Sequence, residues 1–514
     1  MKKRLLLLTC LLTGFVAINI AQTRYLEEVF SSTTVTSDVP YGQNFTVLTG
    51  SPLLAPLMMD VYEPAGDSLT GRPLIIYLPT GSFLPRYINQ LCTGDKTDST
   101  TVEMCKRLAR QGYVVAACNY RTGWNPALPT QEERTESILQ AVYRALQDTK
   151  TAVRFFRKDH AESGNTYNIN PNRIAIGGQG SGGYVSLAYG SVDKLSEIQL
   201  PKFYNPTTSA FMVDTAVWGD WDGYGGNPAL NYVNHAGYPT DVSMTFNIGG
   251  AIGDSSWIDA GEVPTVSYHG VADAFAPYTT GIVYVPGTTL YVIEVSGGSV
   301  VSRLQNANGN NDVFKTPAIT DVYTTMADGY NTSLDGTYGN GGDEGLYPFV
   351  GPADGNGPWE WWSNAQVGVE APLYGADSAT CVTNSYASNP VYEFLGEATG
   401  RLRALGFVDT IQGYLAPRLY RVLIENTPSE IGELSNLDVS IYPNPSNGAI
   451  NIISTENNPI NRVDFYATTG KLIMQENNIG ADMYTNSNLK LSSGMYIVNV
   501  HFESGIVTKK IIVR

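Results

Sequence analysis

The chain has 514 residues and a formal net charge of −16, which is long enough for at least two domains and a sizeable core. A surface of this charge repels phosphate backbones and anionic lipid, so nucleic acid and membrane surfaces are excluded as main partners. After the N-terminal segment, no run approaches the roughly 20 apolar residues that a membrane span needs. We therefore expect no transmembrane segment.

The N-terminus has the pattern of a signal peptide. Lys2, Lys3 and Arg4 form a charged start, residues 5–12 are mostly apolar, and small residues end the segment near Ala21. We assign residues 1–21 to a signal peptide and expect the protein to be secreted or held at the cell surface after passing through the periplasm. Removal of the three basic residues would take the formal charge to −19.

Four cysteines remain after this segment: Cys92, Cys105, Cys118 and Cys381. An exported protein meets an oxidising compartment, and we expect Cys92 to pair with Cys105. No CxxC motif or Cys/His cluster suggests zinc. No metal and no cofactor is predicted.

From about Met58 to His269, short apolar runs alternate with amphipathic helical stretches. This is the pattern of a mostly parallel sheet with helices on both faces, that is, of an α/β fold. The first such domain is assigned to residues 22–426. Buried strands are predicted at 74–78, 113–120, 173–176 and 264–268, and helices at 101–111 and 133–158.

Beyond Asp273 the pattern changes twice. It first loosens into Gly-, Asn- and Asp-rich loops with scattered helical pieces, and residues 328–344 are the richest in turn formers. Over residues 437–514, short alternating runs at 438–442 and 495–500 are separated by turns. The sequence therefore predicts a small, all-β, sandwich-like domain at 437–514, joined to the first domain by a linker at 427–436.

Several blocks of the first domain occur in the order found in the esterase and lipase branch of the α/β-hydrolase family. The chain resembles that family over about residues 55–280, and the resemblance implies an α/β-hydrolase-like, doubly wound sheet and an esterase-like hydrolase. The blocks that carry it are Met59 to Pro64, Pro73 to Phe83, Gly112 to Arg121, Asn172 to Gly178, and His269 to Asp273.

The family nucleophile is a serine at the tip of a sharp strand-to-helix turn, with small residues two positions before and after it. In this chain residues 178–183 read Gly-Gln-Gly-Ser-Gly-Gly. Counting from either flank puts Gly180 at the tip, so Ser181 falls one residue late. Ser181 becomes the nucleophile only if the chain slips by one residue, which puts Gln179 where a small residue is needed.

Histidine gives an independent test of the triad. The resemblance implies an acid at Asp273 and a general base on a later loop, but no histidine follows Asp273 within the α/β domain. His235 precedes the acid, although geometry rather than chain order decides a triad. Asp273 is also explained as a turn-capping residue. The full chain holds four histidines: His160, His235, His269 and His501.

The oxyanion loop departs from the family as well. Pro79-Thr80-Gly81-Ser82-Phe83 stands where the family commonly has His-Gly-Gly-Gly-Phe. The resemblance implies an oxyanion hole built from the backbone N–H groups of Gly81 and Ser82, with less glycine freedom than usual.

The C-terminal domain resembles the type A sorting domain of type IX secretion. This resemblance implies that the type IX secretion machinery is a partner through residues 437–514 and that the protein crosses the outer membrane. The motifs that carry it are Tyr442-Pro443-Asn444-Pro445, Asn447-Gly448, Asp464-Phe465-Tyr466, Ser493-Gly494-Met495-Tyr496 and Lys509 to Arg514.

These patterns lead to three alternative predictions of function. The first is a secreted, esterase-like protein with a degenerate triad, a possible pseudoenzyme with weak or no Ser-type ester hydrolysis, whose pocket binds a small ester or a glycan. The second is an active carboxylesterase on carbohydrate or small esters, using Ser181, Asp273 and His235. The third is a glycan-binding surface protein that stacks sugars on a Trp-rich face, for which packing of the same rings in the core is the alternative. The aromatic residues are Trp218, Trp221, Trp257, Trp359, Trp361 and Trp362.

Overall fold

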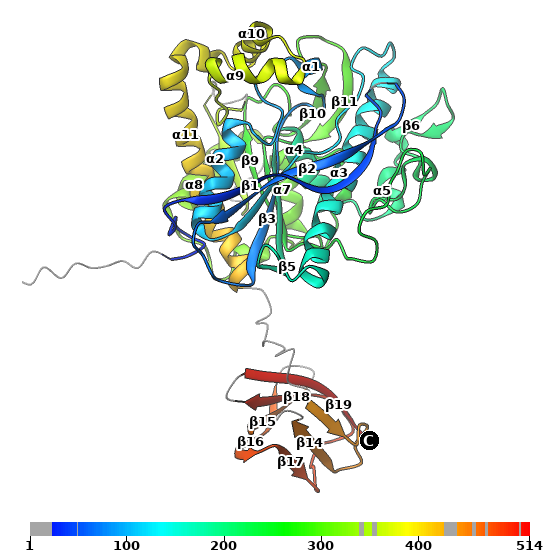
Figure 1. Cartoon of the computed structure of the whole chain (residues 1–514), viewed down its shortest axis with the longest axis vertical. Helices are drawn as coiled ribbons and strands as arrows, with labels where there is room; N and C mark the ends of the chain where they lie inside the picture. The colour runs from blue at the N-terminus through cyan, green and yellow to red at the C-terminus, as the bar shows by residue number, and fades with distance from the viewer. Residues whose placement is uncertain are drawn as a thin grey trace, which may run out of the picture. The chain divides into compact units, whose positions relative to one another are not determined.

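The computed structural model describes residues 23–48, 50–338, 344–351, 357–425, 439–454, 459–467, 471–502 and 505–514. The chain divides into two compact units, with the boundary between Glu425 and Asn426 (Figure 1). The segments predicted as signal peptide and linker lie outside the described residues. Among the helices described, none is both long enough and apolar enough to cross a membrane.

An eight-stranded sheet in the order β1-β2-β4-β3-β5-β8-β9-β12 forms the centre of the first unit. The β1/β2 and β2/β4 pairs are antiparallel and all the other pairs are parallel. The predicted mostly parallel sheet is confirmed. The strands are β1 (Thr33–Thr46), β2 (Leu53–Pro64), β3 (Arg72–Leu78), β4 (Val114–Cys118), β5 (Ile169–Gln179), β8 (Met244–Ile248), β9 (Thr265–Gly270) and β12 (Leu346–Phe349).

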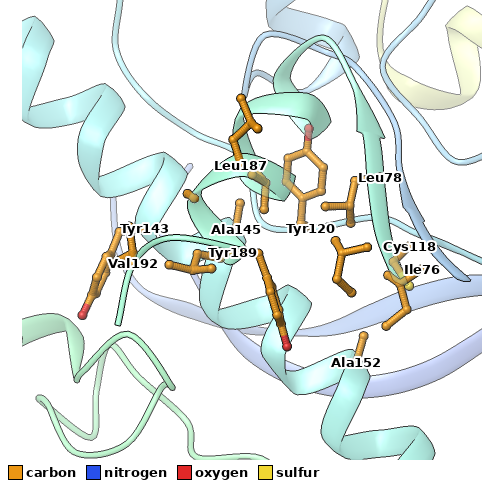
Figure 2. Packing of buried hydrophobic residues seen from close by; sticks show 14 of the residues in the cluster. Ile76, Leu78, Cys118, Tyr120, Tyr143, Ala145, Ala152, Leu187, Tyr189 and Val192 are labelled. Atoms are coloured by element: carbon orange, nitrogen blue, oxygen red, sulfur yellow. The ribbon is translucent and has the colours of Figure 1, made fainter. Parts of the chain in front are cut away.

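Helices cover both faces of this sheet because its strands are apolar on both sides. Along β3, Ile76 and Leu78 face one core, and Ile75 and Tyr77 face the other. Figure 2 shows part of the first of these cores, where Ile76 lies beside Cys118. The helices of the first core are α3 (Gln131–Glu162), α4 (Ser181–Tyr189) and α7 (Gly298–Ala307), and those of the second are α2 (Ser99–Gln111), α8 (Val322–Tyr338) and α11 (Pro390–Tyr420).

Helix α3 shows how local sequence sets an element. It begins with a capping box, in which the Thr130 hydroxyl accepts from the Glu133 N–H (3.2 Å) and the Glu133 carboxylate accepts from the Thr130 N–H (3.1 Å). The helix extends the predicted 133–158 segment by a few residues at each end.

Two elements between residues 273 and 428 differ from the sequence prediction. The stretch rich in turn formers is helical as far as Tyr338, because α8 packs into the core through Ala327 and because Asn331 Nδ2 donates to the Leu346 carbonyl of β12 (3.0 Å). Strand β12 itself was not predicted, since all four of its residues are buried and show no alternation.

Smaller elements complete the first unit. Helices α1, α9 and α10 lie at the same end of the sheet (Figure 1), which is its carboxyl end because α1 follows the loop after β3. These elements are α1 (Arg86–Asn89), α5 (Leu195–Ile198), α6 (Thr215–Trp218), α9 (Asn364–Glu370), α10 (Ser378–Ser388), β6 (Tyr204–Asn205), β7 (Ala210–Phe211), β10 (Thr280–Tyr284) and β11 (Tyr291–Ser296).

The predicted Cys92–Cys105 disulfide is wrong. All four described cysteines are free, buried thiols. Cys92 lies in electrostatic range of Cys381, and its N–H donates to Ser385 of α10 (2.8 Å), whereas Cys105 in α2 lies near Cys118 of β4. The two cysteines predicted to pair therefore pack against different elements.

The second unit is a small all-β domain, as predicted. Its two antiparallel sheets have the strand orders β13-β14-β17 and β16-β15-β18-β19 and enclose their own apolar core. The predicted strands at 438–442 and 495–500 correspond to β13 and β18. The strands are β13 (Val439–Tyr442), β14 (Ile450–Ser454), β15 (Ile460–Ala467), β16 (Leu472–Ala481), β17 (Met483–Asn486), β18 (Gly494–Phe502) and β19 (Gly505–Val513).

Candidate active site

A single residue joins β5 to α4. Gly180 has φ 52° and ψ −120°, a backbone conformation that favours glycine, and its N–H donates to the Ile248 carbonyl at the end of β8 (2.8 Å). A Cβ atom on Gly178 would collide with the Gly182 carbonyl, and one on Gly182 would collide with the Leu78 carbonyl. These two glycines flank Gly180 symmetrically, and Gly180 lies at the tip.

Ser181 is the first residue of α4 and is buried. Its hydroxyl lies 2.9 Å from the phenol oxygen of Tyr120, which donates its own proton to the Pro79 carbonyl (2.8 Å). Because a phenol carries one proton, the Ser181 hydroxyl donates to Tyr120. The hydroxyl of Ser181 is thus used in an internal hydrogen bond.

A different hydroxyl lies next to the tip. The Thr80 side chain, from the loop after β3, occupies the space in which a Cβ atom on Gly180 would stand. Thr80 is half-buried, and its hydroxyl makes no hydrogen bond to any described residue.

Gly81 and Ser82 follow directly in the same loop. Both have positive φ, 138° and 55°, and a side chain on Gly81 would meet the Gly94 backbone at 2.9 Å. Their carbonyls accept hydrogen bonds from the Leu84 N–H (2.9 Å) and the Trp124 indole (2.8 Å), while their own N–H groups have no partner within the described ranges. The Ser181 N–H, in the first turn of α4, also has no intrahelical acceptor. The loop therefore offers backbone donors close to the tip.

Asp273 lies in the loop after β9. Its Oδ1 accepts from the N–H groups of Phe275 (2.8 Å) and Ala276 (3.0 Å), which is the turn-capping arrangement. Burial raises the pKa of this carboxyl to about 7, although the two hydrogen bonds oppose the shift. Its Oδ2 lies 3.8 Å from the point where a Cβ on Gly249 would stand.

The two histidines nearest in sequence to Asp273 hydrogen-bond to backbone groups and not to Asp273 or Ser181. His269 is fully buried: Nε2 donates to the Ala276 carbonyl (2.8 Å), Nδ1 accepts from the Gly298 N–H (3.1 Å), and burial lowers its pKa to about 4. His235 Nε2 lies 2.8 Å from the Tyr41 carbonyl of β1. Across the described chain, no hydrogen bond joins any two of Ser181, His235 and Asp273, so the structure does not assemble that triad.

Glu360 is a residue that the sequence prediction did not select. It lies in the loop after β12, which neighbours β9, and therefore follows the tip and Asp273 in chain order. Burial raises its pKa to about 8, and the carboxylates of Asp98 and Asp273 contribute to the shift. The sequence feature that could have pointed to Glu360 is that it is the one carboxylate within the aromatic run 359–362.

The tryptophans around Glu360 belong to the core. Trp359, Trp361 and Trp362 are 2%, 8% and 5% exposed, and Trp257 is 5% exposed. The Thr100 hydroxyl of α2 donates to the Trp359 carbonyl (2.9 Å) and fixes the loop. The expected stacking surface for sugars is therefore not formed by these rings, which are already covered by protein.

Two family matches account for the two units. Residues 59–225 match the BD-FAE family, an esterase domain of the α/β-hydrolase type, and residues 440–514 match the secretion system C-terminal sorting domain. The first unit is therefore similar to an esterase domain of the α/β-hydrolase type, and the second to a type IX sorting domain. The BD-FAE match includes the tip at Gly180 and ends before Asp273 and Glu360. The sorting-domain match indicates a secreted or cell-surface protein.

Solved structures similar to this chain include an esterase from Thermogutta terrifontis. Esterase 2 phosphorylated by paraoxon is 17% identical, with 48% of this chain and 74% of that chain covered and a TM-score of 0.27. Its butyrate-bound form is 14% identical, with 66% and 89% covered and a TM-score of 0.30. Similarity at this level carries no inference about activity. No curated protein sequence matches the chain.

Proposed function

We propose that this secreted protein has weak or no Ser-type ester hydrolysis, and that it retains the hydrolase pocket as a binding site for a small ester or a glycan. The proposal rests on the observation that Gly180 occupies the tip while the Ser181 hydroxyl donates to Tyr120. A serine esterase needs a nucleophilic hydroxyl within reach of a general base. Loss of either group costs several orders of magnitude in rate.

Two further features support a retained binding site. The backbone donors of Gly81 and Ser82 have no partner in the described part of the chain, and the loop that carries them keeps its strained shape. Asp273 keeps its position after β9 with one oxygen not used in capping. These groups are suited to a carbonyl or hydroxyl ligand.

The test is hydrolysis of p-nitrophenyl acetate by the purified protein and its Ser181→Ala variant. The proposal expects no burst of p-nitrophenol and rates for the two proteins within about twofold of each other. Turnover that the Ser181→Ala change abolishes would refute the proposal and support the second function, an active carboxylesterase. Retained glycan binding without hydrolysis, measured on a glycan array, would identify the ligand class.

Export is proposed in the same account. We infer that residues 1–21 are a signal peptide, that 22–426 form the hydrolase-like domain, that 427–436 are a linker, and that the type IX machinery recognises 437–514. The basic start of the chain and the sorting-domain match at 440–514 support this division. A chain that lacks 437–514 is expected to remain in the periplasm.

A further inference from the structure

The loops after β9 and β12 bring two carboxyl groups to the carboxyl end of the sheet, where Gly180 lies. A Cβ on Gly249 would stand 2.9 Å from the Trp359 ring and 3.8 Å from Asp273 Oδ2, so the residue before Glu360 and the Asp273 carboxyl flank the same glycine. Gly249 follows Ile248, whose carbonyl accepts the Gly180 N–H. The Asp273 carboxyl is therefore next to the turn.

Glu360 is linked to the turn by a second route. Its charge acts on Tyr77, and the Tyr77 hydroxyl donates to Gln179 Oε1 (2.8 Å). Gln179 directly precedes Gly180. Glu360 is thus in electrostatic range of Asp273 and of Tyr77, whose hydroxyl binds the residue at the base of the turn.

Neither carboxyl has a compensating positive charge. The groups that face them are Tyr184 of α4, Tyr77 of β3 and Asp98 at the start of α2. Asp98 is already bound to Arg86 and to the N–H groups of Gly94 and Asp95. Within the described residues, no lysine, arginine or histidine acts on Asp273 or Glu360. Two uncompensated carboxyls that raise each other's pKa share protons rather than ionise together.

Unused donors lie beside the pair. Gln179 is fully buried and its Nε2 has no hydrogen-bond partner, and the same holds for Nε1 of Trp359, which is 2% exposed. A buried N–H without an acceptor is costly. These donors fit a carbonyl or hydroxyl oxygen and disfavour a cation, although the carboxyls alone would suit one.

We propose that Asp273 and Glu360 form a catalytic acid–base pair that hydrolyses carboxylic esters through a bound water, without a covalent intermediate. The proposal goes beyond the proposed function, which concerns only serine chemistry. The ionised member takes a proton from water, and the water oxygen forms a bond to the acyl carbon. The protonated member gives its proton to the alcohol oxygen as the acyl carbon–oxygen bond breaks. Ester and water become acid and alcohol, and the pair returns to its starting state by exchanging one proton with solvent.

The raised pKa values of the two groups support this assignment, because a pair that holds one proton near neutral pH contains both an acid and a base. Both residues are half-buried rather than fully enclosed, so each keeps some contact with solvent. The backbone donors of Gly81 and Ser82 are placed on the loop that the same turn packs against.

The experiment measures p-nitrophenyl acetate hydrolysis by the full mature chain and by the Asp273→Asn, Glu360→Gln, doubly substituted and Ser181→Ala variants, against matched buffer. The expected results are a rate above buffer, at least a tenfold loss in each carboxamide variant, little further loss in the double variant, and no effect of Ser181→Ala. The intact-mass spectrum of acid-quenched protein should carry no acetyl group.

Each contrary outcome has one meaning. A wild-type rate equal to that of buffer overturns the acid–base pair and leaves the proposed function intact. The same holds if a carboxamide variant keeps the wild-type rate and thermal unfolding shows that this variant is folded. Loss of activity in Ser181→Ala, or an acetyl group on the protein, overturns both. The pH profile adds a further check, since the pair requires activity that falls on both the acid and the alkaline side of its optimum.

Discussion

The hydroxyl group of Thr80 fills the space beside Gly180 in which the Cβ of a nucleophilic serine would lie. The two residues are complementary: the glycine gives room to the threonine, and the threonine prevents any larger residue at the tip. A simple return to serine at position 180 is thus opposed by packing as well as by backbone strain.

Gly180→Ser is expected to destabilise the protein. The φ of 52° at this position costs a non-glycine residue about 1–3 kcal/mol, and the collision with Thr80 adds overpacking. Addition of Thr80→Ala should recover part of the loss, with Thr80→Ala alone as the control. Chemical denaturation measures the free energy of unfolding of all three variants. A Gly180→Ser protein as stable as the wild type would show that the turn differs from the one described here.

Tyr120→Phe is expected to cost more stability than Ser181→Ala. The first change leaves the Ser181 hydroxyl and the Pro79 carbonyl without Tyr120, at a cost of about 1–3 kcal/mol, whereas the second removes one donor, at about 1 kcal/mol. A double-mutant cycle on denaturation free energies should show coupling between Tyr120 and Ser181. Additive effects would mean that the two hydroxyls do not interact.

His269 is expected to destabilise the protein in acid. Its pKa in the folded state is about 4, below the ordinary value of 6.5, so the unfolded chain binds the proton first. The contribution is fully present above pH 6.5 and is lost as the pH falls towards 4, by about 3 kcal/mol. His269→Gln should flatten the stability profile in this window. An unchanged slope between pH 6.5 and 4 would contradict the buried, neutral assignment.

Glu360→Gln and Asp273→Asn are expected to have the opposite pH dependence. Both carboxyls have raised folded-state pKa values, about 8 and about 7, so the unfolded chain loses these protons first and stability falls as the pH rises from about 4 to those values. Each carboxamide should therefore stabilise the protein at pH 8, relative to pH 4, by about 4 kcal/mol. Thermal unfolding at pH 4 and pH 8 measures this change in stability. Glu370→Gln, which alters a carboxylate outside the pair, is the control.

The α/β body was predictable from the sequence where its elements carry regular patterns. The strand at Arg72–Leu78 and the helix at Gln131–Glu162 follow, within a few residues, from an apolar run and an apolar stripe. Strand β12 was not predictable because four buried residues give no period. Helix α8 was obscured by its own turn-forming residues, which tertiary packing overrides.

The candidate site was only partly readable from the sequence. The spacing of the glycines around residue 180 indicated the tip, because the turn depends on residues that are neighbours in the sequence. The partner of Ser181 was not foreseeable, because Tyr120 lies in the loop after β4, 61 residues away. Glu360 was hidden for the same reason, since its relation to Asp273 depends on a strand that no pattern revealed.

The most direct test of the central claim is covalent labelling with an organophosphonate probe directed at nucleophilic serines, followed by mass spectrometry of the intact and digested protein. Because the tip is glycine and the Ser181 hydroxyl is bound to Tyr120, the account predicts no phosphonyl group on Ser181 under conditions that fully label an active serine esterase. Stoichiometric labelling of Ser181 that is lost in Ser181→Ala would contradict it.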